Sequence, residues 1–293
     1  MLSKRDTQIK QLLDYLVLAY KTPQFITSDP VSIPHRFKHD KKAAELTAFL
    51  AALFTYGQRP KIIALLNNLL STMNNDPVGF VENFNPKKEG KLFKNFVYRF
   101  NTGDDLIVLL SCLQHAYKEY QSLENMFTAH KQPDNLQQSI GGFLDELTRN
   151  TPPQSSGLKF LFAHPRHGGP CKRFNLFLRW VVRKDAADLG LWHTALGPAE
   201  LTIPLDTHVQ KCNRLFKFSK RKSPDWQQAA EITAALQRFN PQDPMAYDYA
   251  LMGLGLALNT AGLDVERVSL SQLLLPTAQV VKQNCVLPAA AIS

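Results

Sequence analysis

Hydrophobic residues recur at intervals of three and four along most of the chain, and this periodicity limits the folds that it can adopt. The pattern is clear in three early stretches: Leu12, Leu13, Leu16 and Ala19; Leu46, Phe49, Leu50 and Leu53; and Ile62, Leu65, Leu66 and Leu69. Such spacing places apolar side chains on one face of an α-helix, and the period-two alternation typical of strands is nearly absent. We therefore expect an all-α protein of about ten helices.

Proline positions indicate where helices begin. A capping residue followed by proline is typical of a helix start, and it occurs at Asp76-Pro77, Ser223-Pro224 and Asp243-Pro244. Two stretches are expected to be irregular: residues 23–39, with three prolines, and residues 150–157, with the sequence NTPPQSSG. The second separates an ordinary helical half from a basic half. We expect a single domain over residues 1–293.

Length and composition exclude several classes of protein. A chain of 293 residues with 44% hydrophobic content can bury a substantial core. The N-terminal segment mixes charged and apolar residues, which predicts an amphipathic helix and no signal peptide. No apolar run approaches the roughly 20 residues of a spanning helix, so we expect a cytoplasmic protein that does not contact membranes. The four cysteines form no CxxC pair, so no structural metal is expected.

The positive charge is concentrated in one stretch. The chain carries a net charge of +9, and residues 164–222 hold twelve Lys or Arg against four Asp or Glu. One interpretation is a solvated basic face without a polyanionic ligand. The other is a phosphate-binding surface, whose affinity would fall steeply with salt because counterions are released.

The segment HPRHGGPCKRFNLFLRWVVRK begins this basic stretch. Gly168 and Gly169 permit a tight turn, and Pro170 suits the first turn of a helix that we expect to begin near Cys171. Lys172 then lies in the first turn, where the partial positive charge of the exposed N–H groups is expected to lower its pKa. A neutral amine can attack a sugar carbon, although a lysine in a basic helix is more often a solvated charge or a phosphate contact.

A second segment, LTIPLDTHVQKCNRLF, places Asp206 directly before an expected helix. The simple interpretation is an N-cap that accepts hydrogen bonds from the N–H groups two and three residues on. A capping carboxylate is also rigidly held and ionised, so it can stabilise the cation that forms when a glycosidic bond breaks.

The hairpin followed by Lys172 and the PLDTHV element together resemble the helix-hairpin-helix DNA glycosylase superfamily. The late segment DPMAYDYALMGLG, and the spacing of 34 positions from Lys172 to Asp206, are most similar to the archaeal 8-oxoguanine glycosylase branch. The whole chain also resembles an uncharacterised bacterial family related to these enzymes. The resemblance implies a two-lobed helical fold in which residues 157–258 form the catalytic, DNA-facing part.

Residue by residue, the resemblance implies that Lys172 is the Schiff-base nucleophile and Asp206 the catalytic carboxylate. It also implies that Gln58, Asp248 and Met252 contact the extruded base. The residues expected to bind DNA phosphates are Gly168, Gly169, Arg173, Arg179, Lys211 and Arg214.

The hairpin and the base pocket depart from the superfamily pattern. The glycines lie four and three places before the lysine instead of four and two, and Pro170 has no N–H to offer a phosphate. Met252 stands where the archaeal branch has an aromatic residue, so selectivity for 8-oxoguanine does not follow. Only Cys285 lies where an iron–sulfur cluster would need four cysteines, so no cofactor is expected apart from a monovalent cation at the hairpin, which the resemblance allows.

The expected function is that of a monomeric, nucleoid-associated DNA repair glycosylase with AP-lyase activity, which extrudes a damaged base from duplex DNA. The sequence identifies neither the lesion nor the opposite base, and it does not distinguish DNA from structured RNA as the substrate. One alternative is a catalytically silent DNA-binding or DNA-structure-sensing protein on the same scaffold. Another is a thiol enzyme that uses Cys171 at the helix start, where a thiol pKa falls, with His167 or His208 as its base.

Overall fold

The structure is a computed structural model that describes residues 2–262 and residue 273. Its α-helices are α1 (Lys4–Tyr20), α2 (Pro23–Thr27), α3 (Ser32–His35), α4 (Lys41–Leu53), α5 (Arg59–Thr72), α6 (Pro77–Glu82), α7 (Gly103–Tyr120), α8 (Leu123–Ala129), α9 (Leu136–Leu147), α10 (Ser156–Leu161), α11 (Lys172–Val182), α12 (Thr207–Phe216), α13 (Trp226–Gln237) and α14 (Asp248–Thr260). Short 3-10 helices are η1 (Glu89–Phe93), η2 (Pro165–His167), η3 (Pro198–Glu200) and η4 (Pro244–Tyr247). One small antiparallel sheet pairs β1 (Val97–Tyr98) with β2 (Asn101–Thr102).

The expected all-α class is confirmed, and so is the N-terminal helix. The estimate of about ten helices was too low, because several helices of four to seven residues are too short to show a periodicity. Two of these, α2 and α3, lie in the stretch 23–39 that was expected to be irregular, so that expectation was wrong. None of the described helices combines the length and the apolar content needed to cross a bilayer.

The proline signals locate two of the three helix starts. Asp76 caps α6 by accepting a hydrogen bond from the Gly79 N–H, as the sequence predicts. Asp243-Pro244 opens η4, which continues directly into α14. At Ser223-Pro224 the prediction is wrong by two residues, since α13 begins at Trp226 with Asp225 as its cap.

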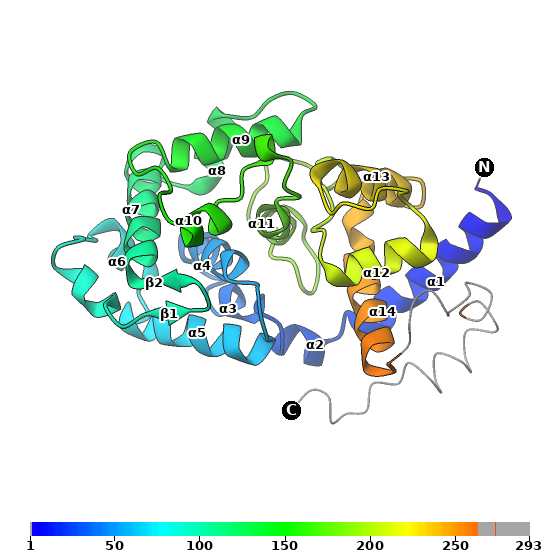
Figure 1. The fold of residues 1–293 in the computed structure, drawn as a ribbon, viewed down its shortest axis with the longest axis horizontal. Coiled ribbons are helices and arrows are strands. Elements are labelled where there is room, and N and C mark those ends of the chain that lie inside the picture. Colours follow the sequence, from blue (N-terminus) through cyan, green and yellow to red (C-terminus); the bar gives the residue numbers. More distant parts are fainter. Residues whose placement is uncertain (1, 263–272, 274–293) are drawn as a thin grey trace.

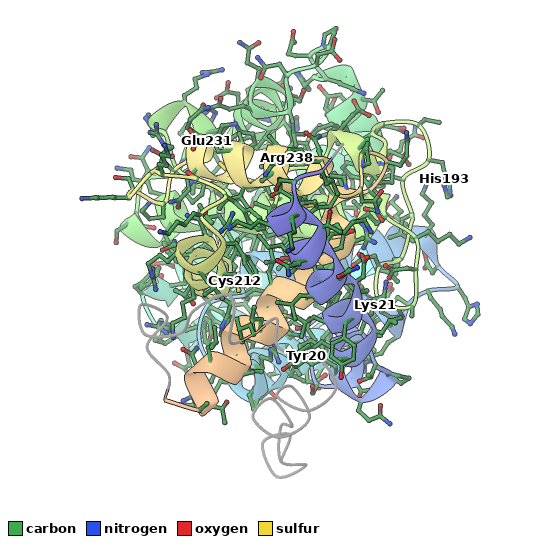
Figure 2. All side chains as sticks on the ribbon, turned by 90° about the vertical axis from the view of Figure 1, so that its right-hand side faces the viewer. Tyr20, Lys21, His193, Cys212, Glu231 and Arg238 are labelled. Atoms are coloured by element: carbon green, nitrogen blue, oxygen red, sulfur yellow. The ribbon has the colours of Figure 1, made fainter. Side chains whose placement is uncertain are left out.

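The helices lie in two groups side by side, which Figure 1 shows with α4 to α9 on the left and α1, α12, α13 and α14 on the right. Helix α11 lies between the groups and packs against α4. In the second group α14 packs against both α1 and α12. Figure 2 looks onto this end of the molecule and shows α1 lying across α14, with Tyr20 at the end of α1.

Two glycines of α14 allow these close approaches. A Cβ at Gly253 would overlap the ring of Tyr20 on α1. A Cβ at Gly255, on the other face, would lie 2.6 Å from the Cβ and 2.8 Å from the Cα of His208 in the first turn of α12. Contacts between carbon atoms are normally 3.5–4.0 Å long, so any larger residue would push these helices apart. Gly255 therefore sets the position of the start of α12.

A buried carboxylate joins the left-hand helices. Glu45 of α4 is 1% exposed and accepts hydrogen bonds from the N–H groups of Leu123 and Glu124, which begin α8. It also accepts bonds from the Trp192 indole and the Tyr117 hydroxyl. Burial raises the pKa of Glu45, and these four donors act against that increase. This single side chain therefore connects α4, α7, α8 and the loop after α11.

Candidate functional site

A pocket of about 410 Å³ lies where the two groups of helices meet. Its walls come from the connection between α4 and α5, from α11, from the start of α12 and from α14. Six residues singled out by the sequence line it together, although up to 194 positions separate them (252 minus 58): Gln58, Lys172, Arg179, Asp206, Asp248 and Met252. The fold thus brings the predicted nucleophile, carboxylate and base-contacting residues into one cavity.

Lys172 is the first residue of α11, so the expected start of this helix is confirmed. The preceding Cys171 has a φ of 47°, in the left-handed region, and turns the chain from the hairpin into the helix. The Lys172 Nζ donates a hydrogen bond of 3.3 Å to the Thr55 carbonyl and lies 4.0 Å from the Asp206 Oδ2. The side chain is 33% exposed, so the amine is held on two sides and remains open to the pocket.

Asp206 is the N-cap of α12, as its sequence position predicts. Its Oδ1 accepts hydrogen bonds of 2.9 Å from the N–H groups of His208 and Val209. The other oxygen, Oδ2, is the atom that faces Lys172. One carboxylate therefore caps the helix with one oxygen and presents the second to the pocket.

The three residues expected to contact a base are placed differently from one another. Gln58 is exposed at the N-cap position of α5, and within the described part of the chain its side chain makes no hydrogen bond. The Met252 Sδ accepts a hydrogen bond of 3.1 Å from the Arg59 Nη2. Asp248 is 5% exposed and its carboxylate pairs with Arg179. Burial raises the pKa of Asp248 to about 6, against the lowering effect of Arg179.

Arg59 was not singled out by the sequence, although it lines the same pocket. Its guanidinium lies 4.6 Å from the centre of the Phe25 ring, and its Nε is 3.7 Å from the Asp29 Oδ2. His208 was considered only as a base for Cys171, yet it also lines the pocket, and its buried Nδ1 has no hydrogen-bond partner among the described residues. The contacts of Arg59 come from α2, α14 and the loop before α3, so only the fold reveals them.

The expectation that Arg179 binds a DNA phosphate was wrong. Arg179 is 3% exposed and pairs with Asp188 and Asp248 in the interior. Arg183, one turn later, pairs with the same Asp188 and with Asp243. These two arginines lie on the inward face of α11 and neutralise buried carboxylates, so they are not available to a polyanion.

Arg173 is half-buried, and its guanidinium contacts neighbouring protein groups. Its guanidinium lies 3.6 Å from the centre of the Phe160 ring, and its Nη1 donates to the Phe160 carbonyl at 2.6 Å. Burial lowers the pKa of Arg173 to about 10. This side chain packs the start of α11 against α10, and its binding to a phosphate stays a prediction.

The other residues expected to bind phosphates lie nearer the surface. Gly168, with a φ of 76°, is exposed, and its carbonyl accepts a hydrogen bond from the Trp226 N–H. Gly169 is partly exposed and has open space where a side chain would be. Arg214 is exposed and Lys211 is half-buried, and neither forms an ion pair within the described residues. Their binding to phosphates stays a prediction.

Cys171 does not have the properties of a reactive thiol. It is 2% exposed, and its Sγ donates to the Ala163 carbonyl at 3.3 Å. Burial raises the pKa of the thiol to about 12. The lowered pKa expected from its place at a helix start is therefore wrong, because desolvation outweighs the field of the helix.

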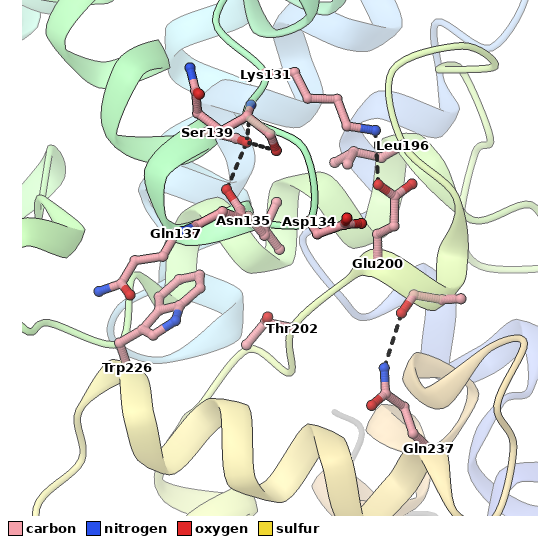
Figure 3. Close-up of a pocket in the computed structure, with 13 residues that line it drawn as sticks. Lys131, Asp134, Asn135, Gln137, Ser139, Leu196, Glu200, Thr202, Trp226 and Gln237 are labelled. Carbon is pink, nitrogen blue, oxygen red and sulfur yellow. Dashed lines mark hydrogen bonds and ion pairs between the residues drawn. The ribbon is translucent and has the colours of Figure 1, made fainter.

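A second pocket, of about 460 Å³, lies between the start of α9 and α13 (Figure 3). Its polar side chains bind neighbouring protein groups: Lys131 pairs with Glu200 at 2.8 Å, and Gln237 donates to the Ala199 carbonyl. The Lys131 amine is therefore in direct contact with its carboxylate, whereas the Lys172 amine lies 4.0 Å from the Asp206 Oδ2. Among the described residues, no group of three or more His, Cys, Asp or Glu is arranged to hold a metal ion. Cys285 lies outside the described residues.

Comparisons with known proteins identify a family but no activity. No curated protein and no solved structure matches the chain. A family model described as "Protein of unknown function (DUF2400)" matches residues 29–257, which include every residue of the pocket described above. The chain belongs to this family.

Proposed function

We propose that the protein is a DNA glycosylase with AP-lyase activity, built on a two-lobed fold like that of the helix-hairpin-helix glycosylases. The observation that carries this proposal is the position of the Lys172 amine, 4.0 Å from the unshared oxygen of Asp206 in an open pocket. An amine nucleophile beside a fixed carboxylate is what base excision through a Schiff base requires. A pocket of 410 Å³ is within the range of sites that enclose small ligands, and an extruded base is such a ligand.

In the proposed reaction, the unprotonated Lys172 Nζ attacks C1′ of the extruded nucleotide. The bond between C1′ and the base breaks, and its electron pair leaves with the base. The proton lost from Nζ passes through the Asp206 Oδ2 to the departing base. Asp206 also stabilises the positive charge that develops on the sugar, because its carboxylate is already fixed by its two capping hydrogen bonds.

The C1′–O4′ bond then breaks with its electrons on O4′, which takes up a proton from water, and the nitrogen lone pair forms an iminium with C1′ as the sugar ring opens. Transfer of a proton from C2′ to water gives an enamine, whose electrons expel the C3′ oxygen with the electron pair of the C3′–O bond on the phosphate, and this nicks the strand. The Thr55 carbonyl supports this chemistry by orienting the Lys172 amine toward the pocket.

The pocket walls supply contacts for the base. Gln58 is an exposed lining residue whose amide makes no hydrogen bond to the described residues, so it can donate and accept hydrogen bonds with a base. Met252 can cover a face of the base with its thioether. Asp248 presents little surface, so we assign it mainly to holding Arg179 beneath the pocket.

Borohydride trapping on duplexes that carry single lesions or abasic sites tests this function. The parent should form a covalent adduct with at least one lesion, and Lys172→Gln should form none. Lys159→Gln, which removes an exposed lysine from the neighbouring helix α10, is the matched control and should trap normally. Trapping by Lys172→Gln at the parental level would overturn the assignment of the nucleophile.

Asp206→Asn separates the two roles of the carboxylate. Asparagine is as good an N-cap as aspartate, so α12 should keep its position while the negative charge is lost. We expect base release to slow by about 100-fold or more, with little change in the free energy of unfolding. If the parent binds duplex DNA tightly but forms no adduct with any lesion, catalysis is refuted and the DNA-binding alternative takes its place.

A further inference from the structure

A groove of about 520 Å³ follows the last turns of α12 and the loop of residues 217–225 after it. Five cationic side chains line it, and no carboxylate does: Arg214, Lys217, Lys220, Arg221 and Lys222. The uncharged lining residues are Gln210, Asn213, Ser219 and Gln228. The sequence located positive charge in this region, but it could not show that the charges surround one hollow.

Buried polar side chains hold the loop in place. Asn213, 4% exposed, accepts a hydrogen bond from the Ser219 N–H at 2.7 Å and donates to the Ser219 carbonyl at 3.2 Å. Gln228, also 4% exposed, donates to the Arg221 carbonyl at 2.6 Å. The Ser219 hydroxyl donates to Glu231. Since the loop is ordered before any ligand arrives, binding does not have to meet the entropic cost of ordering it.

Most of the charge in the groove is not neutralised by the protein. Arg221 pairs with Asp225. Within the described part of the chain, the other four cations form no ion pair: Arg214, Lys217, Lys220 and Lys222. Like charges gathered in this way repel one another, and a ligand with several negative charges relieves the repulsion.

We propose that this groove binds backbone phosphates of the duplex whose damaged nucleotide occupies the pocket of Lys172, an inference that rests on the proposed function. Helix α12 joins the two places, because Asp206 caps its start, Arg214 lies in its last turn and Lys217 is its C-cap, 8 and 11 positions after Asp206. At 1.5 Å per residue these positions are about 12 and 16 Å from Asp206. B-DNA advances about 3.4 Å per base pair, so the contacts fall about four to five base pairs from the lesion if α12 runs along the duplex.

Salt dependence of binding to undamaged duplex DNA tests the groove without reference to catalysis. The variant with Arg214, Lys217, Lys220 and Lys222 all changed to Gln should lose at least tenfold in affinity at low salt. The slope of log affinity against log salt should become shallower by about 3 to 4, because each phosphate contact contributes about 0.9. The control changes four scattered exposed lysines to Gln and removes the same net charge: Lys4, Lys38, Lys87 and Lys118. Its slope should change by less than 1.

Duplex length provides a second measurement. The parent should bind weakly when the duplex ends fewer than four base pairs from the lesion on one side, and the four-site variant should not respond to this shortening. An unchanged slope, or an equal change in the control, overturns the groove as a phosphate site. If the four-site variant loses binding to duplex RNA but binds duplex DNA like the parent, the groove is overturned as a DNA site. Failure of the parent to trap any lesion would refute the glycosylase and leave the slope measurement intact.

Discussion

Gly255→Ala should slow the reaction much more than it destabilises the fold. The added Cβ would lie 2.6 Å from the Cβ and 2.8 Å from the Cα of His208, so the start of α12 must move away by roughly 1 Å to reach normal contact distances. Overpacking of this kind costs about 1–3 kcal/mol, and alanine returns about 1 kcal/mol of helix propensity. We therefore expect the free energy of unfolding to fall by about 0–2 kcal/mol.

The functional loss is expected to be larger because Asp206 moves with the helix that it caps. A displacement of about 1 Å in a catalytic group can cost about 100-fold in rate, so borohydride trapping should slow by about 10-fold to 100-fold. Urea unfolding and trapping of the same preparations measure the two effects. Gly253→Ala is the control, because its Cβ meets Tyr20 on the opposite face of α14 and leaves α12 alone. The reasoning is refuted if Gly255→Ala reacts at the parental rate, or if Gly253→Ala slows the reaction as much.

Three further measurements follow from buried groups. Burial raises the pKa of Asp248 to about 6, so the folded protein holds this proton more tightly than the unfolded chain. Relative to Asp248→Asn, the free energy of unfolding of the parent should fall by roughly 3 kcal/mol as the pH rises from about 4 to 6. An increase in that free energy over the same range, measured by urea unfolding, would contradict the assignment. Glu45→Ala leaves four hydrogen-bond donors without their acceptor and should lower the free energy of unfolding by about 3 kcal/mol or more in the same assay. A variant as stable as the parent would show that water replaces the carboxylate. Cys171 should stay unmodified by iodoacetamide in the folded protein at pH 8, and rapid alkylation seen by peptide mass spectrometry would show that the thiol is accessible.

Features that depend on neighbouring residues in the chain could be predicted from the sequence. The cap at Asp206 needs only the residue and the backbone of the next turn, and the helix start at Lys172 needs only the hairpin before it. Both were therefore found without knowledge of the fold. The all-α class follows from periodicity for the same reason.

Features that depend on distant partners could not be predicted. Arg179 appeared to be one more cation of a basic segment, but its partner Asp248 lies 69 residues further on and makes it an interior residue. Arg59 gave no signal, since its contacts with Phe25 and Met252 come from opposite ends of the chain. The sequence predicted the positive charge of the basic groove but not its shape. The shape depends on the hydrogen bonds by which the buried side chains of Asn213 and Gln228 hold the loop.

The packing of α1 on α14 has a consequence for how the protein is synthesised. The apolar face of α1, with Ile9, Leu12, Leu13 and Leu16, is buried in the folded protein and packs against a helix that begins at Asp248. A ribosome releases α1 long before it has made α14, so for most of translation this face has no native partner. The nascent chain therefore exposes a hydrophobic surface that a chaperone could recognise, and docking of α1 must come late in folding.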